Sequence, residues 1–382
     1  MKKLLIIRKS SEDFGGIEGQ VCRLASYLRD NEIAVPALVT SDIGSIFARR
    51  FSALGLKVYQ APAGQVDIFE AAEIISGIVQ RDDISVVQTH TFRESVLGRV
   101  IKFKNPNVVH IFRPQTYINN SFIPNWKKKA YHVLDYVTSG WVDKYVANGE
   151  YLAEELKKAS YIKAQQIEVV INGRDGIGEP DGPCLIPGGP LPPKVAMVAN
   201  LFWKKGHDTL IKALGILKKR GIHINARLIG GENTNFDAAK TPITDALKQL
   251  AREVGVESQI EFYGHTEDMA AALKDYPVLI LPSDSEGVPN CVLEAMSLRK
   301  LILASKVGGV PELLTHNVSG LLFPPQNPVA TAEVLEEVFV RTAGQWEAMR
   351  TAAFHRWQKQ FSMAGMMDGY LRVYKQYGIV RN

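Results

Sequence analysis

Residues 278–297 read VLILPSDSEGVPNCVLEAMS, and this stretch holds the local pattern on which the fold assignment depends. Its beginning, Val278–Leu281, is an apolar run typical of a strand buried on both faces of a sheet. A polar loop follows, and Cys291–Ser297 has the spacing of a helix, which Pro289 is suited to open. Strand, loop and helix in this order form the repeating unit of parallel α/β sheets.

The same unit recurs along the chain. Predicted strands before residue 172 are Leu4–Ile7, Val35–Val39, Leu56–Tyr59, Ile84–Val87, Val108–Phe112, Lys144–Ala147 and Glu168–Ile171. After residue 194 they are Val195–Ala199, Ala226–Ile229, Ile260–Tyr263, Val278–Leu281 and Leu301–Ala304. Helical segments alternate with them, among them Glu18–Arg29, Ile68–Gln80, Tyr151–Lys158, Asp208–Lys219 and Ile243–Val254. The pattern predicts doubly wound sheets with helices on both faces.

The segment between the two series of strands is rich in glycine and proline, which interrupt helices and interior strands. We expect an N-terminal domain over 1–175, a linker over 176–193, a second domain over 194–358 and a C-terminal helix over 359–382 that packs on the first domain. Two domains agree with a length of 382 residues. Ligands bind at the carboxyl ends of the strands in such sheets, so a cleft between facing domains is the expected site.

Composition excludes several classes of protein. The net charge is +5, and 46% of the residues are hydrophobic against 22% charged, which is an ordinary globular mixture. The basic residues form no stripe of the kind that binds nucleic acid. The cysteines, Cys22, Cys184 and Cys291, lie far apart without a CxxC motif, so we expect neither a disulfide framework nor a metal site.

The start of the chain favours a cytoplasmic protein. Its apolar run, Leu4–Ile7, is closed by Arg8 and Lys9, which is too short for a signal peptide and indicates a first buried strand. No apolar stretch approaches the ~20 residues that cross a bilayer. The expected protein is soluble, or peripheral at the inner face of the membrane.

Two carboxylates stand near the predicted start of the helix in the opening stretch. Glu286 lies in the loop and Glu294 about one helical turn later, with seven residues between them. Helix N-termini attract anions, while carboxylates accept hydrogen bonds from hydroxyls, so the pair suits a ligand with phosphates and sugars. From spacing alone, two glutamates that cap a helix start explain the pattern equally well.

Three further motifs follow predicted strands. Lys204-Lys205-Gly206 places cations before the helix Asp208–Lys219, although a plain helix entry is the commoner meaning of Lys-Gly. Gly15-Gly16 lets the backbone approach a ligand closely, or forms a tight turn. His90 lies at the carboxyl end of Ile84–Val87, where a histidine is better placed for function than most, although a lone histidine is usually structural.

In this order, and with Asn172-Gly173-Arg174-Asp175 after the first series of strands, these motifs resemble the retaining glycosyltransferases of family four, which have the GT-B fold. The likeness extends over nearly the whole chain. Its most specific parts are the E-x7-E segment Glu286–Glu294, Lys205-Gly206, Gly308–Glu312 and Asn317–Leu322. The resemblance implies two Rossmann-like domains facing across a cleft, the first binding an acceptor and the second a nucleotide-sugar.

The resemblance also implies residue roles. Glu286 would contact the donor sugar, Lys205 would neutralise the diphosphate, and His90 would lie close to the transferred sugar. The implied donor-binding positions are Glu294 at the ribose, Gly264 at the nucleobase, the backbone of Val288, Pro289 and Asn290 beside Glu286, and Gly15, Gly16, Asn200 and Lys204 around the diphosphate.

Two departures from the family pattern stand out. The stretch Asn200–Trp203 has no arginine where the family commonly places one on the diphosphate, so Lys204 would act as a point charge without the fork geometry of arginine. Arg299-Lys300 stands where the family usually has a glycine, and we expect it to be surface variation.

The implied activity is transfer of a sugar from a UDP- or GDP-sugar to a glycan or lipid-linked acceptor, with retention of anomeric configuration, in cell-surface polysaccharide or lipopolysaccharide assembly. Neither a cofactor nor a metal is expected, because Asp284-Ser285-Glu286 precedes a helix start and is better suited to sugar contact than to metal binding. The chief alternative is a non-catalytic GT-B protein that binds a nucleotide-sugar and acts as a scaffold for another transferase. An epimerase, a glycosidase and a nicotinamide dehydrogenase fit the motifs less well.

One local feature of the sequence bears on the nature of the acceptor. Aromatic and basic residues over Phe122–Lys129 would allow contact with an anionic membrane that carries a lipid-linked acceptor. A helix with a solvated basic face explains the same residues equally well.

Overall fold

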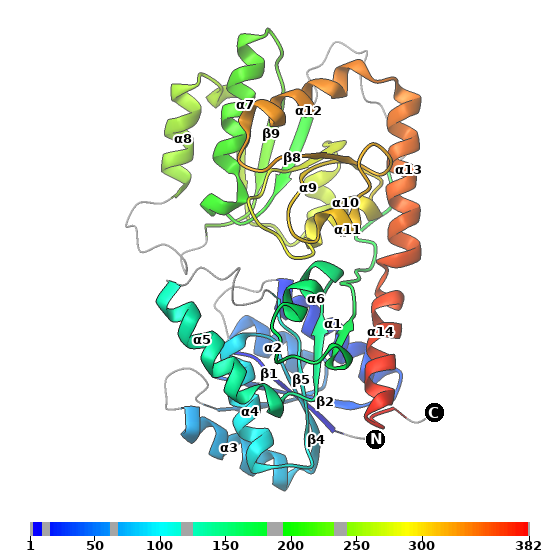
Figure 1. Cartoon of the computed structure of the whole chain (residues 1–382). Coiled ribbons are helices and arrows are strands. Elements are labelled where there is room, and N and C mark those ends of the chain that lie inside the picture. The colour runs from blue at the N-terminus through cyan, green and yellow to red at the C-terminus, as the bar shows by residue number, and fades with distance from the viewer. Residues whose placement is uncertain are drawn as a thin grey trace. The chain divides into compact units, whose positions relative to one another are not determined.

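The computed structural model describes residues 3–9, 16–61, 68–115, 125–181, 194–232 and 243–380 (Figure 1). The chain divides into two compact units. Unit 1 is Met1–Ile171 with Met366–Asn382, and unit 2 is Asn172–Gly365. The chain therefore passes from one unit to the other twice, and the expected linker residues 182–193 lie outside the described ranges.

Unit 1 contains a sheet of seven strands in the order β3-β2-β1-β4-β5-β6-β7, with parallel pairing throughout. The strands are β1 Lys3–Ile7, β2 Val35–Thr40, β3 Lys57–Gln60, β4 Ile84–Thr89, β5 Val109–Phe112, β6 Lys144–Ala147 and β7 Ile167–Val169. The helices are α1 Gly16–Asp30, α2 Ile46–Ala53, α3 Ile68–Arg81, α4 Phe92–Lys104, α5 Asn125–Thr138 and α6 Glu150–Lys157, with the short helices η2 Ser139–Trp141 and η3 Ala164–Gln166. Outward growth from β1 in both directions is the doubly wound order predicted from the sequence.

Unit 2 repeats this plan with a parallel sheet in the order β10-β9-β8-β11-β12-β13. Its strands are β8 Lys194–Val198, β9 Asn225–Ile229, β10 Ile260–Gly264, β11 Val278–Leu281, β12 Leu301–Ser305 and β13 Leu321–Phe323. Its helices are α7 His207–Lys219, α8 Ile243–Glu253, α9 Met269–Leu273, α10 Asn290–Ser297, α11 Val310–Leu313, α12 Pro328–Val340 and α13 Ala343–Gln360, with η4 Trp203–Lys205 and η5 Glu257–Gln259.

The predicted strands are confirmed to within two residues at each end. The central strands were readable because they are buried on both faces; every residue of β11 and of β12 is buried. Edge strand β13, which has three residues and pairs solely with β12 among the described strands, was not predicted.

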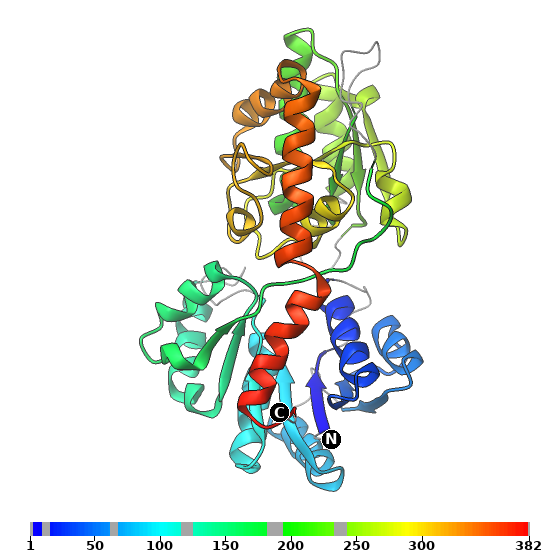
Figure 2. The ribbon, with the colours of Figure 1, turned by 90° about the vertical axis from the view of Figure 1, so that its right-hand side faces the viewer.

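The C-terminal helix α14 (Met363–Gln376) packs on unit 1, and Figure 2 shows it crossing that unit next to α1. The hydroxyl of Tyr374 donates to Gln88 Oε1 over 2.8 Å, and Gln20 of α1 contacts the sulfur of Met366. Tyr370 and Tyr374 are fully buried. The return of the helix to the first unit is therefore part of the fold.

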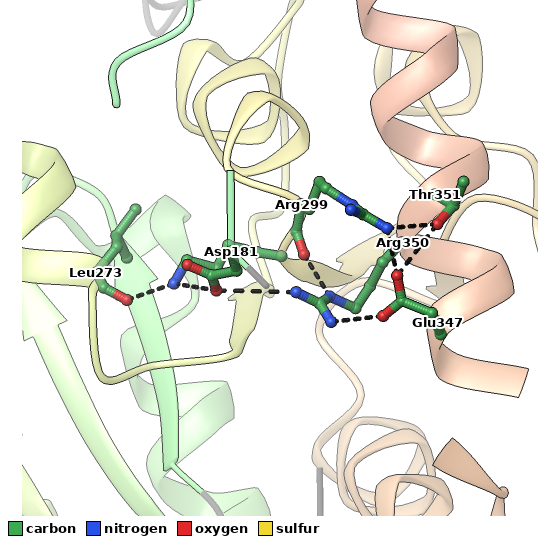
Figure 3. Close-up of polar contacts among 7 residues, drawn as sticks. Asp181, Leu273, Arg299, Glu347, Arg350 and Thr351 are labelled. Carbon is green, nitrogen blue, oxygen red and sulfur yellow. Dashed lines mark hydrogen bonds and ion pairs between the residues drawn. The ribbon is translucent and has the colours of Figure 1, made fainter. Parts of the chain in front are cut away.

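A polar network around two buried cations, Lys300 and Arg350, fixes the end of α10 against α13 (Figure 3). Lys300 Nζ donates to the carbonyl of Leu273 and pairs with Asp181, both over 2.7 Å. Arg350 Nη1 pairs with Glu347 over 2.9 Å, and its Nε donates to the carbonyl of Arg299. The network joins α10, α13 and the segment at Asp181 that enters unit 2.

The expectation that Arg299-Lys300 is surface variation is wrong. Lys300 is 1% exposed, and burial lowers the pKa of its ammonium group. Arg299 has φ +55°, a left-handed conformation in which a glycine is the least strained residue. The side chain of Arg299 offsets this backbone strain with hydrogen bonds to Glu347 and Thr351.

Two buried histidines are held without charge. In β5, His110 Nδ1 donates to the carbonyl of Trp141 over 3.0 Å, so Nε2 accepts from Thr89 Oγ1. Burial lowers the pKa of His110 to about 3 and, in α7, that of His207 to about 4.

Within the residues described, no helix has the length and apolar character needed to cross a bilayer.

The lowered histidine pKa values predict acid sensitivity of the fold. Between about pH 6.5 and the folded pKa values of about 4 for His207 and about 3 for His110, the unfolded histidines bind protons while the folded ones do not. Over this range the free energy of unfolding falls by up to about 1.4 kcal/mol per pH unit for each group as the pH is lowered. Urea denaturation at several pH values should show this slope, and His110→Gln should make it shallower. Replacing the exposed His265 by Gln is the control; equal slopes in wild type and His110→Gln would contradict the assignment.

Candidate functional site

The loop between β11 and α10 carries both glutamates of the E-x7-E segment. Glu286 lies in the loop, and Glu294 lies one turn into α10, whose first residue follows Pro289. Their side chains are only 9% and 7% exposed. The loop leaves the carboxyl end of β11, so the sequence placed both carboxylates correctly at that edge of the sheet.

The loop between β8 and α7 meets this glutamate loop. Lys205 Nζ lies 2.7 Å from Glu286 Oε1, although the two residues are 81 positions apart. The backbone N–H of Asp284 donates to the carbonyl of Lys204 over 2.8 Å, which ties the loops together at the main chain. The structure therefore joins two motifs that the sequence could only present separately.

Glycines allow these loops to approach closely. Gly206 has φ +76°, and a Cβ on it would lie 2.0 Å from the carbonyl oxygen of Pro282. Gly308 has φ +50°, and a Cβ there would lie 1.7 Å from the carbonyl oxygen of Glu286. The Gly308–Glu312 segment thus supports the back of the glutamate loop, which explains why glycine is needed at its first position.

Arg174, to which the sequence analysis assigned no role, forms an ion pair with Glu294. Arg174 Nη2 is 2.5 Å from Glu294 Oε1. The backbone N–H of Arg174 donates to the carbonyl of Phe361 over 3.0 Å, and Trp357 Nε1 donates to the carbonyl of Arg174 over 3.1 Å. We placed Asn172–Asp175 at the end of the first domain, but the contacts of Arg174 lie within unit 2. No local pattern in the sequence indicates that Arg174 pairs with Glu294, because the two residues lie far apart in the chain.

A thiol lies within electrostatic range of both carboxylates. Burial and then the charges of Glu286 and Glu294 raise the pKa of Cys291. Cys291 is the second residue of α10. The thiol is therefore protonated and adds no charge to the site.

The other predicted donor-binding residues of unit 2 lie at the same edge of the sheet. Asn200 and Lys204 follow β8 and are exposed, and Gly264 ends β10 with φ +84°. Val288 and Pro289 are buried in the loop before Asn290, the first residue of α10. Carboxyl ends of parallel strands share one edge, so these positions lie along the same edge of the sheet as the glutamates and Lys205.

Unit 1 presents a second polar cluster at the carboxyl ends of its central strands. His90 follows β4 and is 2% exposed. Its Nε2 lies 3.2 Å from the amide nitrogen of Gln88, which donates, so the proton of the neutral ring is on Nδ1. That Nδ1 is buried and has no hydrogen-bond partner among the described residues. Burial, and then the charges of Arg113 and Arg8, hold the pKa of His90 well below its usual value.

Charged neighbours of His90 were missed by the sequence analysis. Arg8, directly after β1, lies 2.6 Å from Glu18 and 2.9 Å from Glu94. Arg113, directly after β5, donates to Gln20 Oε1 over 2.8 Å. Their positions immediately after predicted strands were the available signal. Of the predicted glycines, Gly16 begins α1, whereas Gly15 lies outside the described residues.

Asp284 and Glu286 have separate partners. Asp284 Oδ2 accepts from Gln326 Nε2 over 2.8 Å, whereas Glu286 pairs with Lys205. Across the described ranges, no three His, Cys, Asp or Glu side chains are grouped so that they could hold a metal ion.

Comparison with known proteins identifies the family. The family model described as "Glycosyl transferases group 1" matches residues 190–351, and that described as "Glycosyltransferase Family 4" matches residues 14–175. These ranges contain the E-x7-E segment and His90, respectively. The chain belongs to the family-four glycosyltransferases.

Curated relatives match over part of their length. An amylovoran biosynthesis glycosyltransferase (AmsK) of Erwinia amylovora is 33% identical over 151 residues, which are 38% of this chain and 35% of that protein. A GDP-mannose-dependent alpha-(1-6)-phosphatidylinositol monomannoside mannosyltransferase of Mycobacterium tuberculosis is 27% identical over 194 residues, 47% of each chain. The chain thus spans about a third of the first relative and about half of the second.

Solved structures share the fold. A glycosyltransferase of Rickettsia africae has a TM-score of 0.82 at 19% identity, covering 98% of both chains. Anabaena Alr3699/HepE in complex with UDP-glucose has a TM-score of 0.81 at 18% identity, covering 98% of this chain and 100% of that one. These comparisons and the two doubly wound sheets establish the GT-B fold.

The close approach at Gly308 predicts a large cost for a methyl group there. Gly308→Ala should lower the free energy of unfolding by about 2 kcal/mol or more, because it combines backbone strain with a clash at Glu286. Gly344, in α13, has open space around its Cα, so Gly344→Ala is the matched control and should be neutral or slightly stabilising. Equal stability of the two variants in chemical denaturation would refute the role of Gly308.

Proposed function

We propose that the chain transfers a sugar from a nucleoside-diphosphate sugar to a glycan or lipid-linked acceptor, with retention of anomeric configuration. The observation that carries the proposal is the approach of Lys205 to Glu286 within 2.7 Å at the carboxyl edge of the unit 2 sheet. It combines a cation for a diphosphate with a carboxylate for sugar hydroxyls, as the family-four motifs imply.

The chemistry of each group fits one part of such a donor. Glu294 would accept hydrogen bonds from the ribose, and Glu286, with the backbone at Val288–Asn290, from the sugar. Lys205 and the N-terminus of α7 would neutralise the diphosphate, with Lys204 and Asn200 nearby. Gly264 would border the nucleobase. The lack of an arginine at Asn200–Trp203 leaves Lys205 as the main cation of the proposed diphosphate site.

The transfer step needs positive potential at the leaving group more than a side-chain base. The bond between the sugar and the diphosphate breaks as the acceptor hydroxyl attacks from the same face, and a phosphate oxygen takes the hydroxyl proton. Lys205 would stabilise the negative charge that develops on the diphosphate. His90 is neutral with its proton on Nδ1, so its proposed role is to donate a hydrogen bond to a sugar hydroxyl.

The names of the relatives support a donor and a pathway class. One relative is named for amylovoran biosynthesis and another for GDP-mannose, while Anabaena Alr3699/HepE was solved with UDP-glucose. We therefore propose a UDP- or GDP-sugar as donor and cell-surface polysaccharide assembly as the process, in the cytoplasm. We propose that neither a cofactor nor a metal is required.

Measurements of donor binding and of sugar transfer should distinguish the proposed role of Glu294 from that of Glu286. Calorimetry against UDP-, GDP-, ADP- and dTDP-sugars, with and without EDTA, should find one donor class whose affinity is unchanged by EDTA. Glu294→Gln should weaken that affinity roughly 10- to 100-fold, because a charged hydrogen-bond acceptor is lost. Glu286→Gln should retain most of the affinity and slow transfer.

The outcomes of this experiment distinguish the candidate functions. Binding of a donor by a chain that neither transfers nor hydrolyses it would favour the non-catalytic scaffold, which the missing diphosphate arginine supports. Wild-type binding and turnover in both glutamine variants would refute the site.

The pairing of Arg174 with Glu294 predicts competition with the donor. The proposed ribose contact uses the same carboxylate whose Oε1 Arg174 holds at 2.5 Å, so the guanidinium competes with the ribose hydroxyls for this group. Arg174→Gln should therefore tighten donor binding several-fold, measured by calorimetry. Arg220→Gln, which removes an arginine from an exposed pair with Glu336, is the matched control. Weaker donor binding in Arg174→Gln would show instead that Arg174 contacts the donor.

A further inference from the structure

Helix α5 of unit 1 (Asn125–Thr138) buries a polar face and exposes an apolar one, which is the opposite of an ordinary surface helix. A surface helix buries its apolar stripe and exposes its polar face. In α5 the side that faces the protein is polar, with Asp135 buried and Lys128, His132 and Thr138 half-buried. The exposed side chains include the large apolar and aromatic residues Trp126, Tyr131, Val133, Leu134, Tyr136 and Val137.

The orientation of α5 is fixed by a buried ion pair. Arg99 of α4 lies 2.6 Å from Asp135, and both side chains are 1% exposed. The hydroxyl of Tyr161 donates to the other Asp135 oxygen over 2.8 Å, and Arg99 donates to Thr138 Oγ1 over 2.7 Å. Turning the apolar face inward would break these contacts and leave buried charges without partners, which is strongly destabilising.

The exposed face is continuous along the helix. Trp126, Ala130, Val133 and Val137 follow one another at spacings of three or four residues, which places them on one side of a helix. Trp126 is 68% exposed, and Val133 and Val137 are each 63–64% exposed. Figure 1 shows α5 on the outside of unit 1, next to α4. Exposed apolar surface of this extent on one helix marks an interaction site.

The charge on the exposed face of α5 indicates which kind of partner binds there. Lys127 and Lys129 are exposed beside Trp126, and the Lys127 ammonium lies 5.3 Å from the Trp126 ring centre. The sequence of α5 contains one acidic residue, Asp135, which is buried. The exposed face is therefore apolar, aromatic and basic. That combination is complementary to an anionic lipid surface, in which apolar side chains enter the headgroup boundary and lysines meet the negative charge.

We propose that the exposed face of α5 docks unit 1 onto an anionic lipid bilayer. The helix lies in the plane of the interface with Trp126 and the valines inserted and the lysines at the headgroups. This inference does not depend on the donor assignment, which concerns unit 2. It gives a lipid-linked acceptor a place to meet the protein.

Flotation of the full chain with lipid vesicles tests the proposal. The chain should bind vesicles of phosphatidylcholine with about one third phosphatidylglycerol and should bind pure phosphatidylcholine far more weakly. Lys127→Glu with Lys129→Glu should reduce partitioning to the anionic vesicles by about 30-fold or more, because each lysine near such a surface contributes about fivefold. Trp126→Ala with Val133→Ser and Val137→Ser should reduce binding to both kinds of vesicle.

Matched controls separate a local site from general charge or hydrophobicity. Lys219→Glu with Lys274→Glu makes the same charge change at exposed lysines of unit 2, and Val340→Ser removes a valine that is 79% exposed. These variants should bind like wild type. Because all the substituted side chains are exposed, circular dichroism should show the same fold in each.

Three results would overturn the proposal. The first is failure of the wild-type chain to bind anionic vesicles, and the second is equal binding by the α5 variants. The third is a concentration-dependent dimer in sedimentation that the α5 variants abolish, which would assign the face to a second copy of the chain. Nucleotide-sugar affinity should be unchanged in the α5 variants, so the outcome is independent of the test of the donor site.

Discussion

Backbone pairing of β8 with β11 is the constraint on which the site of unit 2 depends. Val195 and Ala196 are opposite Val278 and Leu279, and the sheet grows away from this pair in both directions. The loops after β8 and β11 therefore start side by side and lead to helices in different parts of the unit. Lys205 and Glu286 meet because of this topology, and the glycines at 206 and 308 let the loops come close enough.

The same constraint acts in unit 1, where β1 pairs with β4. A cation after the first strand pairs with a carboxylate after the fourth strand in both units: Arg8 with Glu94, and Lys205 with Glu286. The two pairs differ in accessibility, since Arg8 is 13% and Lys205 31% exposed. The more exposed pair belongs to the unit in which we propose that the donor binds. The more buried pair adjoins His90, and the charge of Arg8, after burial and Arg113, contributes to lowering the pKa of that ring.

The strands of both sheets were predicted well from the sequence, whereas the burial, partners and direction of individual side chains were predicted less well. Strands such as β11 were found because burial on both faces leaves a continuous apolar run, and the glutamates were found because their spacing to a helix start is local. Arg174 and Lys300 were missed because their burial and partners depend on segments far apart in the chain. The apolar stripe of α5 could be read from the sequence, but its outward direction is set by Arg99, more than 20 positions earlier.

Cys291 has a consequence for chemical intervention at this edge of unit 2. A thiolate is the reactive form of cysteine, and burial together with two neighbouring carboxylates opposes its formation here. Electrophilic inhibitors that rely on a nearby cysteine would therefore react slowly with this one, despite its position between the two glutamates. A ligand aimed at this edge has to gain its affinity from reversible contacts with Lys205, Glu286 and Glu294.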